Sequence, residues 1–170
     1  MHRLATLPGD PSDDEALLVE QRPAPLLLLT SADSDLKLLS KRLSAGLFPQ
    51  MRGLNLTNLQ HPAAVDHYLR SSLQGTALVL VRLLGGRGHW SYGLEQLRQW
   101  SSASKDRALV VMAGTSDGAM DLASLSSVDP LIALNLGRCL QEGGSANMDL
   151  VLQWCRSWLE GESPVAPEPE

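Results

Sequence analysis

Four short apolar runs alternate with segments of helical periodicity, and this alternation restricts the fold more than any other feature. The runs cover residues 26–29, 51–56, 77–82 and 107–112. Runs of this length and composition are typical of buried strands. Strands that alternate with helices pair in parallel through right-handed crossovers. The sequence therefore predicts an α/β fold: a small doubly wound, flavodoxin-like parallel sheet of about four strands in the order 2-1-3-4, with helices on both faces.

Capping residues and apolar stripes indicate where the helices begin. We expect Asp33 to be an N-cap and Pro62 to lie in a first turn, since both residue types favour those positions. The expected helices begin near Asp33, Pro62, Leu94, Pro130 and Asn147.

The chain divides into three regions by composition. Residues 1–22 are polar and contain Pro8, Gly9 and Pro11, which predicts a flexible arm with at most one short helix around residues 15–20. Residues 23–160 form the predicted α/β domain. Residues 161–170 are rich in proline and glutamate, which is typical of a linker, here to further domains.

Composition excludes several classes of function. The formal net charge is -5 and no basic block is present, which argues against a nucleic-acid partner. No apolar run approaches the ~18 residues of a membrane span, and the N-terminus lacks the pattern of a signal peptide. We therefore expect a cytoplasmic protein. Cys139 and Cys155 lack metal-ligand spacing and are interpreted as buried structural thiols.

One segment contains residues that core packing does not require. Residues 83–97 place three closely spaced glycines, an arginine, a histidine and two aromatic residues between a predicted strand and a helix. Ligands of open α/β sheets bind at such carboxyl ends of strands. The segment lacks the lysine and hydroxyl residue of a phosphate loop, and its glycines do not fit GxGxxG. A nucleotide site is therefore not predicted.

This segment resembles the GGRGYWPYGVEQL-like sequence of CobN-type cobaltochelatase large subunits, with His89 and Ser91 as the evident departures. Further matches occur in the same order along the chain, at residues 29–36, 55–56 with 61–66, 122–126, and 142–144 with Asn147. The resemblance spans roughly residues 1–159. Members of that family are several times longer, so we expect this chain to correspond to an N-terminal domain fragment.

The resemblance implies a function for the larger protein. CobN-type subunits bind a corrinoid tetrapyrrole, and AAA+ partner subunits hydrolyse ATP, with Mg²⁺, to drive insertion of Co²⁺ into hydrogenobyrinic acid a,c-diamide. The implied partners are thus the remaining domains of the large subunit, the ATPase subunits and the tetrapyrrole. We expect the fragment itself to bind no cofactor and to have a substrate-capping or assembly role without catalytic residues.

Ten residues are candidates for contact with the substrate or with another domain. They are Gly85, Gly86, Arg87, Gly88, His89, Trp90, Tyr92, Glu95, Asp33 and Asp35. Aromatic rings could stack on a macrocycle, and a guanidinium could bind its carboxylates. The structural alternative is that Trp90 and Tyr92 fold back as a lid and Arg87 pairs with Glu95. Capping likewise explains Asp33 and Asp35.

Other chemistry is not supported by the sequence. His61 and His67 are six residues apart, which does not place both on one helical face, so no metal site is predicted. No GxSxG motif supports a hydrolase. Two alternatives remain open: a domain like that of the magnesium chelatase large subunit, and a stand-alone flavodoxin-like module for cofactor binding or interaction. The familiar corrinoid-binding motif DxHxxG does not follow the first strand.

Overall fold

A parallel four-stranded sheet lies at the centre of the computed structural model, which describes residues 2–4 and 17–170. Its strands are β3 (Leu26–Thr30), β4 (Met51–Asn55), β5 (Leu78–Leu83) and β6 (Ala108–Ala113). They lie in the order β4-β3-β5-β6. Numbered along the chain, this is the order 2-1-3-4, so the predicted topology is confirmed.

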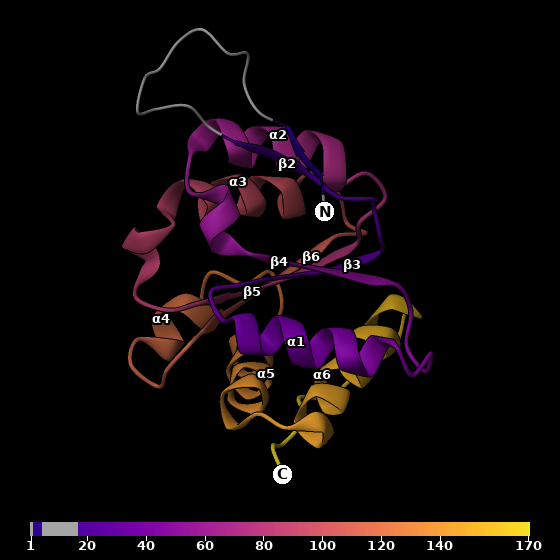
Figure 1. The fold of residues 1–170 in the computed structure, drawn as a ribbon. Coiled ribbons are helices and arrows are strands. Elements are labelled where there is room, and N and C mark those ends of the chain that lie inside the picture. Colours follow the sequence, from indigo (N-terminus) through magenta and orange to yellow (C-terminus); the bar gives the residue numbers. More distant parts are fainter. Residues whose placement is uncertain (1, 5–16) are drawn as a thin grey trace, which may run out of the picture.

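Helices cover both faces of the sheet, as Figure 1 shows. One face carries η1 (Leu56–Leu59), α2 (Pro62–Ser72) and α3 (Ser91–Ser102). The other carries α1 (Asp33–Leu43), α5 (Pro130–Glu142) and α6 (Ser145–Leu159). Because successive side chains of a strand point to opposite faces, Val79 and Val81 pack in the core under α2 and α3, whereas Leu78 and Leu80 pack in the core under α1, α5 and α6.

The region expected to hold a short helix is a strand instead. β2 (Leu18–Glu20) pairs antiparallel with β1 (His2–Leu4), so the predicted helix around residues 15–20 is wrong. Val19 is 1% exposed and joins the core under α2, which favours an extended backbone with one side chain turned inward. Residue 1 and residues 5–16 of the predicted arm lie outside the described residues, so its flexibility there stays a prediction.

The starts of α3 and α6 and the N-cap of α1 differ from the prediction. α3 begins at Ser91, three residues before the expected Leu94. Ala32 is the N-cap of α1, and Asp33 is the first helical residue, whose carboxylate accepts a hydrogen bond from Asn55 Nδ2 at 2.8 Å. The predicted capping role of Asp33 is therefore wrong. α6 begins at Ser145, and the buried Asn147 donates to the carbonyl of Gly143 at 2.8 Å.

One helix was not predicted. α4 (Ala119–Ala123) follows β6. The sequence there is short and contains glycine and aspartate, which favoured a loop. Its residues Leu122 and Ala123 are each 1% exposed, so burial supports this single turn where local periodicity could not reveal it.

Side chains occupy both lateral edges of the sheet. On β6, the amides of Leu109 and Val111 donate to the hydroxyls of Ser127 and Ser126, each at 2.8 Å. On β4, the carbonyl of Gly53 accepts from a side chain near β2, Gln21 Nε2, at 3.0 Å.

Residues 161–170, expected to be a linker, contact α6. Trp154 Nε1 donates to the carbonyl of Pro164 at 3.3 Å, and the amide of Glu170 donates to Asn147 Oδ1 at 2.8 Å. Their role as a linker stays a prediction. Within the described part of the chain, no helix is both long and apolar enough to cross a membrane.

Candidate functional site

The carboxyl edge of the sheet gathers nearly all of the predicted contact residues. Thr30, Asn55, Arg82 and Met112 form one cross-strand row at the ends of the four strands. The loops that follow them carry the acidic residues of α1 and the glycine-aromatic segment. Ligands of open parallel sheets bind outside this edge, at the point where the strand order reverses, which here lies between β3 and β5.

The glycine loop makes one tight turn before α3. Gly85 has a φ of +91°, a conformation that favours glycine, and a Cβ there would lie 2.7 Å from the ring of His89. Residues 87–89 form the short helix η2, and all of its side chains are exposed. No atom lies near a Cβ added at Gly86 or Gly88. The loop therefore presents an open surface in which close approach to the backbone is possible.

Trp90 is a core residue. Its side chain is 6% exposed, and its Nε1 donates to the carbonyl of Leu59 at 2.9 Å. A Cβ at Gly93 would lie only 2.2 Å from the ring, so the glycine provides the space in which the indole packs. This corrects the expectation that Trp90 stacks on a ligand. The lid interpretation fits its position.

Tyr92 stays at the surface. It is 38% exposed, and its hydroxyl donates to Asp66 Oδ1 at 2.7 Å. That hydrogen bond, together with smaller contributions from desolvation and nearby carboxylates, raises the pKa of the Tyr92 hydroxyl. The contact joins the start of α3 to α2 and leaves the side chain partly accessible to solvent.

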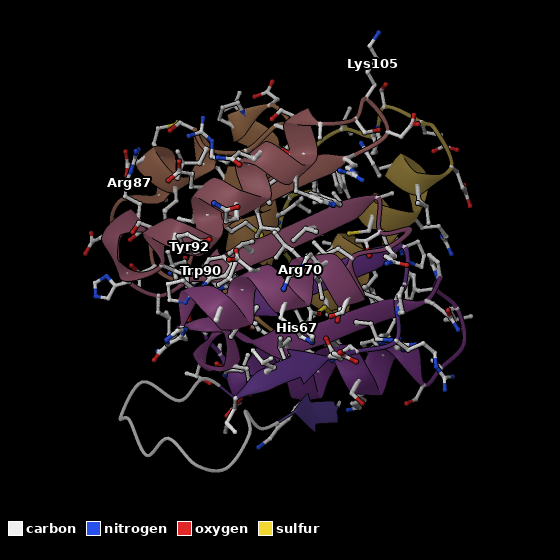
Figure 2. All side chains as sticks on the ribbon, turned by 90° about the horizontal axis from the view of Figure 1, so that it is seen from above. His67, Arg70, Arg87, Trp90, Tyr92 and Lys105 are labelled. Atoms are coloured by element: carbon white, nitrogen blue, oxygen red, sulfur yellow. The ribbon has the colours of Figure 1, made fainter. Side chains whose placement is uncertain are left out.

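Arg87 pairs with Asp121 of α4, so its expected pairing with Glu95 is wrong. The Nη2 atom lies 2.6 Å from Oδ1, and Nε lies 3.1 Å from Oδ2. These hydrogen bonds hold the pKa of the Asp121 carboxyl below its usual range. Both side chains are about half exposed. Figure 2 shows Arg87 on the same side of the molecule as Trp90 and Tyr92. Glu95 is exposed on α3.

Asp33 and Asp35 have separate environments and do not form a paired-carboxylate site. Asp33 is exposed, whereas Asp35 is 5% exposed. The Asp35 carboxylate accepts from Thr30 Oγ1 at 2.7 Å and from Arg82 Nη1 at 2.8 Å. Because Asp35 is engaged in this way, it serves neither as a cap nor as an available general base.

Arg82 is the functional candidate that sequence reasoning missed. It ends an apolar strand run, and its charge there was the available signal. Its Nη2 donates to the carbonyl of Gly114 at 3.2 Å. Its Nε, in contrast, has no hydrogen-bond partner among the described residues, although the side chain is only 9% exposed. An unsatisfied buried donor costs on the order of 1–3 kcal/mol.

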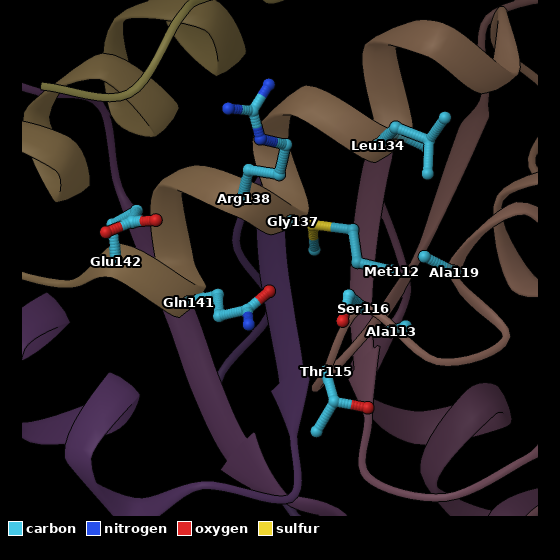
Figure 3. Close-up of a pocket in the computed structure, with 11 residues that line it drawn as sticks. Met112, Ala113, Thr115, Ser116, Ala119, Leu134, Gly137, Arg138, Gln141 and Glu142 are labelled. Carbon is cyan, nitrogen blue, oxygen red and sulfur yellow. The ribbon is translucent and has the colours of Figure 1, made fainter.

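Two cavities open at this edge on the α5 face of the sheet. The first, of about 370 Å³, lies between β6, α4 and α5 and is lined by Met112, Thr115, Ser116, Gly137 and Gln141 among others. Figure 3 shows this cavity. The second, of about 230 Å³, is lined by Ser34, Asp35, Arg82, Gly143 and again Gln141 among others. Gln141 thus stands between them.

The histidines and cysteines have structural environments. His61 Nδ1 accepts from the amide of Ala63 at 3.1 Å as the N-cap of α2, and His67 lies 2.7 Å from a Glu20 carboxylate oxygen. Burial raises the pKa of the Cys139 thiol and that of the Cys155 thiol, the latter to about 12. The described residues contain no group of three or more candidate metal ligands.

Comparison with known proteins gives one consistent result. The chain is 31% identical over 173 residues to the aerobic cobaltochelatase subunit CobN of Pseudomonas aeruginosa, covering 100% of this chain and 14% of that protein. It is 30% identical over 174 residues to the subunit of the same name from Sinorhizobium sp., covering 99% of this chain and 13% of that protein. No protein-family model matches.

A solved structure supports the fold. The catalytic subunit of cobaltochelatase from Mycobacterium tuberculosis superposes with a TM-score of 0.66 at 20% identity, over 86% of this chain and 11% of that chain. The chain therefore spans about one seventh of the length of the curated relatives that it matches. The resemblance to CobN-type cobaltochelatase large subunits is confirmed.

Proposed function

We propose that this chain, a relative of CobN-type cobaltochelatase large subunits, acts as a non-catalytic domain of such a subunit. The enzyme would be an ATP-dependent chelatase that inserts cobalt into hydrogenobyrinic acid a,c-diamide, and the domain would cap the substrate or support assembly. The observation that carries the proposal is the sequence similarity of about 30% along the whole chain to two proteins named for cobalt chelation.

The absence of a catalytic role is argued from the groups at the carboxyl edge. The buried carboxylate of Asp35 is held by Arg82 and Thr30, so it is not available for proton transfer. The remaining titratable groups of the glycine loop are exposed side chains, which lack the burial typical of catalytic acids and bases. We therefore assign contact, and no chemical step, to this edge.

The proposed contact surface consists of Gly85, Gly86, Arg87, Gly88, His89 and Tyr92. It is exposed, and Arg87 is held in position by a single carboxylate on α4. A carboxylate of a tetrapyrrole or of another domain could replace Asp121, because a guanidinium binds such groups through two parallel hydrogen bonds. The open space beside Gly86 and Gly88 would allow a partner to approach the backbone. Glu95 on α3 and Asp33 on α1 are also exposed and stay candidates for contact.

The proposal is tested in the full-length large subunit with its ATPase partner subunits. Arg87→Ala should reduce cobalt insertion substantially while leaving the thermal midpoint of this domain nearly unchanged, because an exposed ion pair contributes little to stability. Arg70→Ala is the matched control, since Arg70 is an exposed arginine on α2 (Figure 2). Normal insertion by the Arg87 variant, or equal loss in both variants, would refute the contact role.

The isolated chain provides a second test. We expect it to show neither ATP hydrolysis nor cobalt insertion when purified alone. Robust turnover by this chain without further subunits would contradict a non-catalytic role.

The sheet order also favours a second candidate, a stand-alone flavodoxin-like module. Such a module would bind a flavin or corrinoid at the edge between β3 and β5. Absorbance titration of the chain with flavin mononucleotide distinguishes the two, and we expect no saturable binding. A magnesium chelatase role would instead appear as insertion of Mg²⁺ by the assembled enzyme.

A further inference from the structure

We infer that the two cavities on either side of Gln141 form one binding site for a ligand that bears a neutral carboxamide group. The site lies at the carboxyl edge on the α5 face of the sheet, shares no lining residue with the contact surface proposed above, and does not depend on the function proposed there. Its polar lining residues are Ser34, Asp35, Arg82, Thr115, Ser116 and Gln141.

The charges around the cavities favour a neutral ligand. Inside, the guanidinium of Arg82 is balanced by Asp35 at 2.8 Å. At the rim, Arg138 and Glu142 carry opposite charges, and Figure 3 shows both head groups extending away from the other lining residues. The first turn of α1 already contains two acidic residues, which oppose an anion at that helix terminus. A phosphate or carboxylate inside the cavities would therefore find the buried cation, Arg82, already paired.

The hydrogen-bonding groups require both donors and acceptors. Arg82 Nε has a proton without an acceptor within the described structure. Ser34, Thr115, Ser116 and Gln141 line the cavities, are exposed, and make no side-chain hydrogen bond to a described residue, so they are free to turn toward a ligand, whereas Arg82 Nε is the buried donor that lacks an acceptor. A carboxamide supplies a carbonyl oxygen for such donors and two N–H groups for the carbonyl of Gln141 and the Asp35 carboxylate. An alcohol or a water molecule also donates and accepts, but from a single oxygen atom, whereas a carboxamide has its donors and its acceptor on separate atoms.

Apolar walls complete the argument. Met112, Ala119 and Leu134 line the larger cavity, and Leu38 and Met148 line the smaller one. A ligand that carries a short alkyl chain next to its amide would bury that chain against these residues. Most small-molecule sites combine an apolar lining with a few polar groups in this way.

The test is a titration of the isotope-labelled 170-residue chain followed by nuclear magnetic resonance. Propionamide should produce saturable shifts at the amides of Ser116 and Gln141 and at the Arg82 Nε–H signal. Propionate and propylammonium should bind about tenfold more weakly, since each adds an uncompensated charge. Gln141→Leu should weaken propionamide binding roughly five- to tenfold.

Gln99→Leu is the matched control, because Gln99 is an exposed glutamine on α3 at the opposite face of the sheet. It should leave propionamide binding unchanged. The proposal is overturned if propionamide gives no saturable shift at Gln141, if propionate binds as tightly, or if the Gln141 and Gln99 variants bind propionamide equally. None of these results bears on cobalt insertion, so failure here is distinguishable from failure of the proposed function.

Discussion

One nitrogen of Arg82, Nη1, lies 2.8 Å from both carboxylate oxygens of Asp35. The pair joins β5 to the first turn of α1 across 47 positions of the sequence. It lies where the otherwise apolar core under α1, α5 and α6 meets the carboxyl edge, and Thr30 Oγ1 adds a third hydrogen bond to the carboxylate. This network positions the α1 terminus against the sheet.

Removing the carboxylate charge should be strongly destabilising. Asp35→Asn leaves the guanidinium of Arg82 buried without a counter-charge, which typically costs about 3–5 kcal/mol. Urea unfolding measures the free-energy change. Asp33→Asn is the control, because Asp33 is an exposed aspartate in the same helical turn, two positions before Asp35. It should have a much smaller effect on the free energy of unfolding. Equal small losses for both variants would show that the buried pair contributes little.

Alanine at Gly93 should destabilise the domain although alanine usually favours helices. The added Cβ would lie 2.2 Å from the Trp90 ring, and overpacking of this kind costs roughly 1–3 kcal/mol. Gly88→Ala is the comparison, because no atom lies within 4 Å of its added Cβ. Thermal unfolding should separate the two variants. A gain in stability for Gly93→Ala would mean that Trp90 does not pack against this residue.

The last helix should contribute to the same core as the sheet. Leu152 is 1% exposed on α6, and its truncation to alanine should cost on the order of 2–5 kcal/mol. Leu131, on α5, is 61% exposed, so Leu131→Ala should change the urea midpoint little. If the midpoint of Leu152→Ala equals that of the unmodified chain, α6 does not support the folded state.

Alkaline conditions should lower stability through a buried thiol. Burial raises the pKa of Cys155 from 9.0 to about 12, so above the ordinary value the unfolded chain loses this proton first. The unfolded state then binds fewer protons than the folded state, and the free energy of unfolding falls as the pH rises through this interval. At a pH below 9.0, the ordinary pKa of a thiol, the stabilising contribution of the buried, protonated Cys155 is fully present.

Urea unfolding in reducing buffer at a series of pH values tests this effect. Cys155→Ala should be less stable overall but should show a shallower decline above pH 9.0. A residual decline is expected from Tyr68, whose hydroxyl pKa is also raised by burial. Parallel curves for both proteins would exclude a contribution of the thiol.

The sheet could be predicted from sequence because its strands are short aliphatic runs that only burial explains. Alternation of strands and helices predicts parallel pairing and right-handed crossovers, whereas the order 2-1-3-4 was assumed from the flavodoxin-like pattern and could not be derived from the residues. β2 was misassigned because three residues carry too little periodicity to distinguish a strand from a helix, and Val19 is extended through its contact with a distant helix.

The site was predictable only in location. The sequence placed the glycine loop at the carboxyl edge, but the partners of its side chains are far away along the chain. Arg87 binds Asp121, 34 positions later, and Trp90 donates to Leu59, 31 positions earlier. Such contacts depend on tertiary packing, which local spacing does not encode. Arg82 was overlooked for the same reason, since its partner lies on another element.

The serines beside β6 determine how this domain can associate. Ser126 and Ser127 occupy the outward amide donors of Val111 and Leu109, and Gln21 occupies a carbonyl on the opposite border at β4. An additional strand at β6 would find both of these amides already engaged, so the serines oppose extension of the sheet by a partner, or by a second copy, on that side. At β4 a single carbonyl is engaged in this way, so the two borders of the sheet differ in how far side chains protect them.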